Sequence, residues 1–145
     1  MTIRVYQDAD WNDWLRMSVA LFPYPPDEVA AGMRAHHARE DAEVFVAERE
    51  DGTLCGFVEV GERSYADGCE STPVAYIEAL YVDPDMRRRG IARSLLAAAE
   101  AWGLSRGRSE IASDALLDND ASHAVHTNAG YEETDRVVQF RKRLR

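Results

Sequence analysis

The sequence predicts an α/β fold for this chain of 145 residues, and three kinds of pattern indicate it. Residues 43–49 and 54–60 read as strands, and the Asp-Gly pair between them is typical of a hairpin turn. An apolar strand at 73–82 then leads through a short turn into a long helix that opens at Gly90. A strand, a tight turn and a glycine-opened helix form one unit that is typical of α/β architectures.

Eleven elements are expected, in the order strand, helix, helix, three strands, helix, strand, helix and two strands. Proline residues break the first helix, Asn119 caps the last helix, and Gly130 ends it. In residue numbers, we expect strands at 3–6, 43–49, 54–60, 73–82, 110–114, 131–134 and 136–144, and helices at 8–21, 27–40, 90–107 and 119–128. With no repeat and no linker, residues 1–145 are expected to form a single domain.

The elbow between the first two helices carries the sequence Phe-Pro-Tyr-Pro-Pro at residues 22–26. Proline lacks the amide hydrogen that a helix needs and restricts the residue before it. The elbow is therefore either a rigid turn or an aromatic lip over a substrate.

Several classes of protein are disfavoured by the composition. No apolar run approaches the roughly 20 residues that a membrane helix needs, and the first residues lack a secretory apolar region. We therefore expect a cytoplasmic protein without a membrane partner. Cys55 and Cys69 are expected to be reduced thiols, and they are too few for a structural zinc site. The histidines show no ligand spacing, so no metal is expected.

The net charge of −9 is unevenly distributed. Nine of the 17 basic residues fall within 87–93 and 136–145, which contain no acidic residue. The rest of the chain has 26 acidic residues against eight basic ones. This surplus either serves solubility or forms an acidic cleft for a cationic substrate, and it disfavours nucleic acid as a partner.

The start of the long helix has the features of an anion-binding site. A helix start exposes unpaired amides and carries partial positive charge. Gly90 lets a ligand approach the backbone, and Arg87, Arg88 and Arg89 add cationic charge. A solvated helix cap is the alternative. The glycine patterns of dinucleotide and nucleoside-triphosphate sites are missing.

The pattern Arg-x-x-Gly-x-Ala after a strand resembles the acetyl-CoA pyrophosphate loop of the GNAT superfamily of N-acetyltransferases. The order of the elements also resembles that of the superfamily over nearly the whole chain. The resemblance implies a mixed, mostly antiparallel twisted sheet with helices on both faces. Its central strand and the following strand form a parallel pair that splays apart.

The resemblance also implies that acetyl-CoA is the cosubstrate. A bulge in the central strand is placed at Leu80, Tyr81 and Val82, whose backbone groups would pair with the pantetheine arm. Amides of the helix start would hold the pyrophosphate, and Asn119 would reach the arm from the other side. The helix-start residues implied in cofactor binding are Arg87, Arg88, Arg89, Gly90, Ile91, Ala92 and Arg93.

Two carboxylates are candidates for catalysis. Direct acetyl transfer requires that the incoming ammonium first loses a proton, and a carboxylate can accept it. Glu78 precedes the expected bulge, and Asp114 ends the neighbouring strand, so both are expected at one cleft. An exposed strand edge or a salt bridge to an arginine is the alternative. His126 stands where many relatives have a tyrosine near the leaving sulfur, either as the acid or as a packed helix residue.

Longer segments resemble bacterial aminoglycoside 6′-N-acetyltransferases, which acetylate the 6′-amine of these antibiotics and confer resistance. These segments begin at residues 65, 76, 112 and 130. Carried over by position, the residues that would line the drug pocket are Phe22, Tyr65, Glu78, Asp114 and Asp135. Relatives are commonly dimers that meet through C-terminal strands, which implies a homodimer. Another amine as substrate, or a non-catalytic acyl-CoA-binding module, is the alternative.

Overall fold

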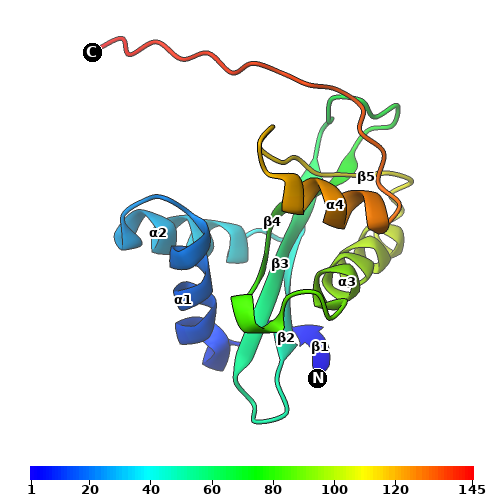
Figure 1. Ribbon diagram of the computed structural model, residues 1–145. Coiled ribbons are helices and arrows are strands. Elements are labelled where there is room, and N and C mark those ends of the chain that lie inside the picture. The colour runs from blue at the N-terminus through cyan, green and yellow to red at the C-terminus, as the bar shows by residue number, and fades with distance from the viewer.

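The computed structural model describes residues 1–145 as a five-stranded sheet between two layers of helices (Figure 1). The helices α1 and α2 lie on one face, and α3 lies on the other (Figure 1). The strands are β1 (Thr2–Val5), β2 (Ala42–Glu48), β3 (Leu54–Arg63), β4 (Val74–Val82) and β5 (Ile111–Ala112). The helices are α1 (Trp11–Leu21), α2 (Pro26–His37), α3 (Ile91–Ser105) and α4 (Asp120–Asn128), with short 3-10 turns at Asp8–Asp10 and Pro84–Met86.

The strands lie side by side in chain order, from β1 to β5. Neighbours pair antiparallel except β4 and β5, which are parallel and are joined by α3. The expected mixed, mostly antiparallel sheet with a parallel pair and helices on both faces is therefore confirmed.

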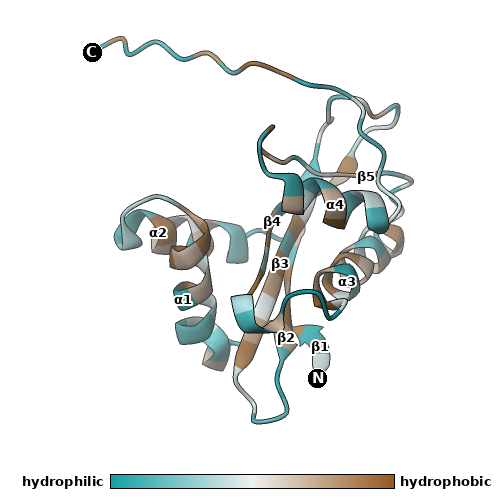
Figure 2. Ribbon diagram, viewed as in Figure 1, coloured by the Kyte–Doolittle hydropathy of each residue, from teal (hydrophilic) through white to brown (hydrophobic).

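Two apolar clusters hold the layers together (Figure 2). Leu95, Leu96 and Ala99 of α3 pack on one face of the sheet. Trp14 and Met17 of α1 pack on the other face. Burial of apolar area is the main stabilising contribution to such a core.

An extra residue in β4 interrupts its pairing with β3. Glu59 pairs with Ala79, but the next residue of β3 pairs with Ile77, so Glu78 is the additional residue. The packing agrees, because Ile77 lies in the α3 cluster whereas Ala79 lies in the α1 cluster. Strict alternation would put both on one face. The bulge thus lies at Glu78, whereas the resemblance had implied a bulge at Leu80–Val82.

The two C-terminal strands that were predicted are not formed. Residues 131–145 have no helix or strand, and the last part of the chain extends away from the body (Figure 1). A strand needs a neighbour to satisfy its backbone groups, and this segment has none within the chain. The strand β5 is also shorter than predicted, because only Ile111 and Ala112 have pairing partners on β4.

None of the helices has both the length and the apolar composition that crossing a bilayer requires. Cys55 and Cys69 are free thiols. No group of three or more His, Cys, Asp or Glu side chains is arranged to hold a metal ion.

Candidate functional site

The start of α3 presents a run of free amides. No acceptor within the chain takes a hydrogen bond from the backbone N–H groups of residues 87–93. Gly90 has φ 78°, and Arg88 has φ 62°, which is unusual for a residue with a side chain. We call this run of amides at residues 87–93 the cradle. It is open to a ligand, because a Cβ atom at Gly90 would have no neighbour within 4 Å. These features suit the binding of an anion such as a phosphate group.

Ion pairs hold the turn that leads into this cradle. Asp83, with only 6% of its surface exposed, accepts hydrogen bonds from Arg16 at 3.0 Å and from Arg49 at 3.2 Å. Burial alone would raise the pKa of Asp83, but the two guanidinium groups outweigh burial and hold it below its usual range. Arg49 also pairs with Asp85 at 2.7 Å.

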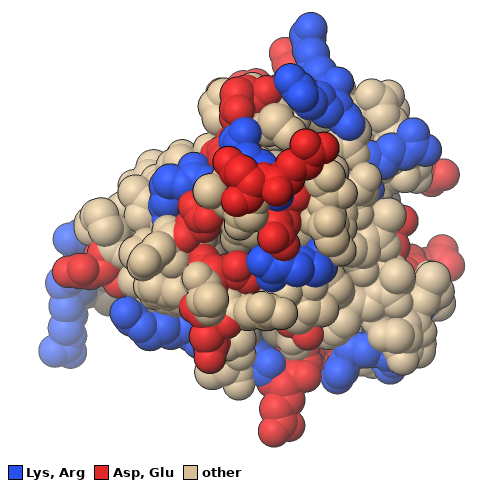
Figure 3. Space-filling view, turned by 90° about the horizontal axis from the view of Figure 1, so that it is seen from below, with Lys and Arg blue, Asp and Glu red and all other residues tan.

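On the face seen in Figure 3, acidic and basic side chains are mixed, with no large area of one sign.

One edge of β4 is unpaired beside the cradle. The pairing of β4 with β5 stops at Tyr76, opposite Ala112. From Ile77 to Val82 the strand is paired only with β3. Backbone groups alternate along a strand, so those of Tyr81 face β3, whereas those of Leu80 and Val82 face the open side, where an extended ligand can pair with them.

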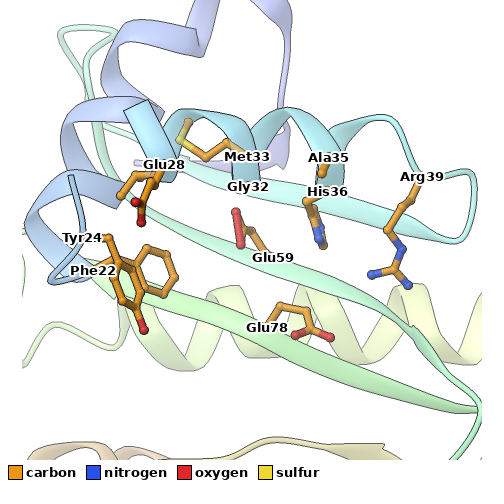
Figure 4. A pocket seen from close by; sticks show the side chains of 11 residues that line it. Phe22, Tyr24, Glu28, Gly32, Met33, Ala35, His36, Arg39, Glu59 and Glu78 are labelled. Atoms are coloured by element: carbon orange, nitrogen blue, oxygen red, sulfur yellow. The ribbon is translucent and has the colours of Figure 1, made fainter. Parts of the chain in front are cut away.

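A hollow of about 550 Å³ lies between α2 and the sheet (Figure 4). Aromatic rings from the elbow close one end of it, where Phe22 and Tyr24 are stacked with centroids 6.5 Å apart. Glu59 of β3 and Glu78 of β4 lie along its floor (Figure 4). Aromatic faces and carboxylates together suit a cationic ligand.

Glu78 is joined to Asp114 through two other side chains. Its carboxylate accepts two hydrogen bonds from Arg63, at 2.9 and 2.8 Å. The Arg63 guanidinium lies 3.5 Å from the centroid of the Tyr76 ring, and the Tyr76 hydroxyl donates to Asp114 at 2.5 Å. Burial and the bond to Asp114 raise the pKa of Tyr76. The salt bridge that was the alternative for Glu78 therefore exists, within a polar chain that joins both predicted carboxylates.

Glu59 is a residue of this hollow that the sequence analysis missed. It is only 7% exposed, and no side chain or backbone group donates a hydrogen bond to its side-chain carboxylate. Burial, with a smaller effect of Glu78, raises its pKa to about 7. The sequence signal was a single acidic residue within an otherwise apolar strand, the same signal that identified Glu78.

The other predicted substrate residues lie outside the hollow. Tyr65 is exposed in the loop between β3 and β4, and Asp135 is exposed in the C-terminal segment. This segment starts close to that loop, because a Cβ atom at Gly68 would lie 2.3 Å from the Thr134 hydroxyl oxygen.

Asn119, a predicted cofactor-binding residue, caps α4, and its side-chain oxygen accepts a hydrogen bond from the Ser122 amide at 3.1 Å.

Both ring nitrogens of His126 have partners. Nδ1 donates to the Ser122 carbonyl at 2.7 Å, and Nε2 lies 2.8 Å from the Ser113 hydroxyl oxygen. The ring also contacts Tyr131 edge-on, at a centroid distance of 5.5 Å. These contacts favour a packed helix residue over an acid at the sulfur.

Comparison with known proteins finds similarity over the full chain. The model of the Acetyltransferase (GNAT) family matches residues 7–131. A curated aminoglycoside N(6′)-acetyltransferase type 1 from Stenotrophomonas maltophilia is 39% identical over 144 residues, 99% of this chain and 94% of the relative. One from Serratia marcescens is 40% identical over 133 residues, 90% of this chain and 91% of the relative.

Solved structures agree with this similarity. The apo structure of an aminoglycoside antibiotic 6′-N-acetyltransferase from Acinetobacter haemolyticus has a TM-score of 0.92 at 34% identity, with all of both chains covered. The structure of AAC(6′)-Iy in complex with the bisubstrate analogue CoA-S-monomethyl-acetylneamine has a TM-score of 0.91 at 35% identity. That match covers 98% of this chain and 97% of the other.

Replacement of Glu59 is expected to change how stability depends on pH. The carboxyl ionises near 4.5 in the unfolded chain but near 7 in the folded chain. The wild type therefore loses stability as pH rises between these values, by roughly 3 kcal/mol in total. Glu59→Gln removes this loss, so its free energy of unfolding, measured with urea, should exceed that of the wild type at pH 8 but not at pH 5.

Glu50→Gln is the matched control, because Glu50 is exposed in the hairpin turn between β2 and β3. Its free energy of unfolding should match that of the wild type at pH 5 and at pH 8. An identical pH dependence for Glu59→Gln and the wild type would show that the Glu59 carboxyl is not perturbed.

Proposed function

Because the chain belongs to the GNAT family of acetyltransferases, we propose that it acetylates the 6′-amine of aminoglycoside antibiotics and so confers resistance. The observation that carries this proposal is the full-length similarity to aminoglycoside 6′-N-acetyltransferases. The hollow supports it, because Phe22 and Glu78, two of the predicted drug-binding residues, line it together.

Acetyl-CoA supplies the activated acetyl group as a thioester. The free amides of residues 87–93 hold its pyrophosphate, with the arginine side chains of the same segment around it. The unpaired edge of Leu80, Tyr81 and Val82 aligns the pantetheine arm as an added strand. Asn119 approaches the arm from α4. Fixing the thioester beside the amine makes the reaction effectively intramolecular.

Glu78 is proposed to take the proton from the incoming ammonium. Its place in the bulge directs its side chain into the hollow, next to the free edge of β4. Arg63 orients the carboxylate through two hydrogen bonds. Asp114, linked through Tyr76, provides a second carboxylate for the cationic substrate. The aromatic side chain of Phe22 lines the hollow, and Tyr65, exposed outside it, is proposed to contact the drug from the loop between β3 and β4.

We further propose that the protein is a cytoplasmic homodimer. Val138 and Phe140 are 77% and 91% exposed in an extended segment that has no partner within the chain. Pairing this segment with a second copy would satisfy its backbone groups and cover both side chains. It would also carry Asp135 towards a neighbouring pocket. The two free cysteines agree with a reducing compartment.

A substrate panel with acetyl-CoA tests the activity. The wild type should acetylate kanamycin-type drugs with a free 6′-amine and leave those with a 6′-hydroxyl unchanged. Glu78→Gln should lower kcat by roughly 10²–10⁴-fold, because the general base is lost. Its affinity for CoA, measured by calorimetry, should match that of the wild type.

Glu50→Gln again serves as the control and should retain full activity. Turnover of polyamines or peptides but of no aminoglycoside would point to a different amine as substrate. CoA binding with no turnover of any amine would point to a non-catalytic module.

The oligomeric state is tested by sedimentation equilibrium of the full chain. Wild type is expected to have the mass of a dimer, and the double change Val138→Asp and Phe140→Asp should give a monomer. Gln139→Asp introduces one negative charge on the opposite side of the extended segment and should disturb the dimer less than Val138→Asp or Phe140→Asp alone. A monomeric wild type at micromolar concentration contradicts the proposal.

A further inference from the structure

Two deeply buried carboxylates in this chain have opposite surroundings. Asp83 and Glu59 are 6% and 7% exposed. Asp83 is paired with two arginines, whereas no cationic group or hydrogen-bond donor of the chain reaches Glu59. A buried carboxylate without a partner is costly, so it either takes up a proton or gains a cation from outside the chain.

The basic residues that line the hollow are already engaged elsewhere. Arg39 donates to Asp41 at 2.9 Å and to the Glu62 carbonyl at 2.8 Å. His36 contacts the Glu43 carbonyl at 3.1 Å, and burial lowers its pKa, which favours the neutral ring. The chain itself therefore supplies no cation to Glu59.

The Glu59 side chain nevertheless points into open space. It projects from β3 into the hollow beneath α2, between the aromatic end and His36 (Figure 4). Glu78 projects into the same hollow from the next strand. A cation that enters the hollow from solvent can reach both carboxylates, which makes the substrate the natural source of the missing partner.

We propose that Glu59 is a second ammonium-binding residue of the acceptor pocket, which takes an amine of the substrate other than the one that is acetylated. This inference rests on the proposed function. Adjacent strands are about 4.8 Å apart and the two side chains can diverge, so cations bound at Glu59 and Glu78 lie between about one and two strand spacings from each other. Amines on the 2′ and 6′ carbons of one sugar ring suit such a spacing, and we assign the 2′-amine to Glu59.

Kanamycin A and kanamycin B provide a matched pair of substrates. Both have the 6′-amine, but kanamycin B carries an amine at the 2′ carbon where kanamycin A carries a hydroxyl. Wild type should prefer kanamycin B in kcat/KM by about tenfold, through KM rather than kcat, as a charge-assisted hydrogen bond implies. In Glu59→Gln, the ratio of the two kcat/KM values should fall towards one.

Further variants separate charge from structure. Glu59→Asp keeps the charge on a shorter side chain and should retain a higher ratio than Glu59→Gln. Glu50→Gln should retain the wild-type ratio. Circular dichroism of each variant confirms its fold before the kinetic comparison, and the Asp variant decides the question if the Gln variant does not fold.

Two results would overturn the subsite. One is a ratio near one in the wild type, and the other is an unchanged preference for kanamycin B in Glu59→Gln with its kcat/KM intact. Failure of the proposed function looks different, because wild type would then acetylate neither drug. In that case the subsite is rejected together with the function.

Discussion

The site depends on a single extra residue in the central strand. Glu78 has no counterpart on β3, and the strand therefore changes faces between Ile77 and Ala79. The change turns the Glu78 carboxylate into the hollow under α2. Beyond it, β4 runs on without a partner on its β5 side. One local irregularity thus places a carboxylate next to a free backbone edge.

The same stretch of chain then provides the anion site. After Val82 the turn is held by Asp83 between Arg16 and Arg49, and α3 begins directly beyond it. Unpaired backbone groups therefore lie both along the outer edge of β4 and at the start of α3. They face water in the free protein, so leaving them unpaired costs little, and they are in position before a ligand arrives.

Local patterns explain why much of this was predictable from the sequence. The Asp-Gly hairpin, the apolar central strand and the Arg-x-x-Gly-x-Ala helix start depend on neighbouring residues, and all three were found where predicted. The position of the bulge was missed, because a register shift depends on pairing with a distant strand. Glu59 was missed for the same reason, since only the packing of α2 over β3 shows that it is buried and unpaired.

The C-terminal segment shows a different limit. Its Val137, Val138 and Phe140 are β-branched or aromatic residues of the kind that favours a strand, yet the chain offers no edge that the segment pairs with. Sequence pattern indicates the tendency of a segment to form a strand, whereas formation depends on a partner.

Amide hydrogen exchange with and without CoA, resolved by residue with NMR, tests the central claim most directly. If the outer edge of β4 binds the arm and the start of α3 binds the phosphates, exchange should slow on CoA binding at Leu80 and Val82 and in 87–93. Amides of β1 and β2, which are paired within the sheet, should change little. CoA binding that leaves exchange in both segments unchanged would contradict the account.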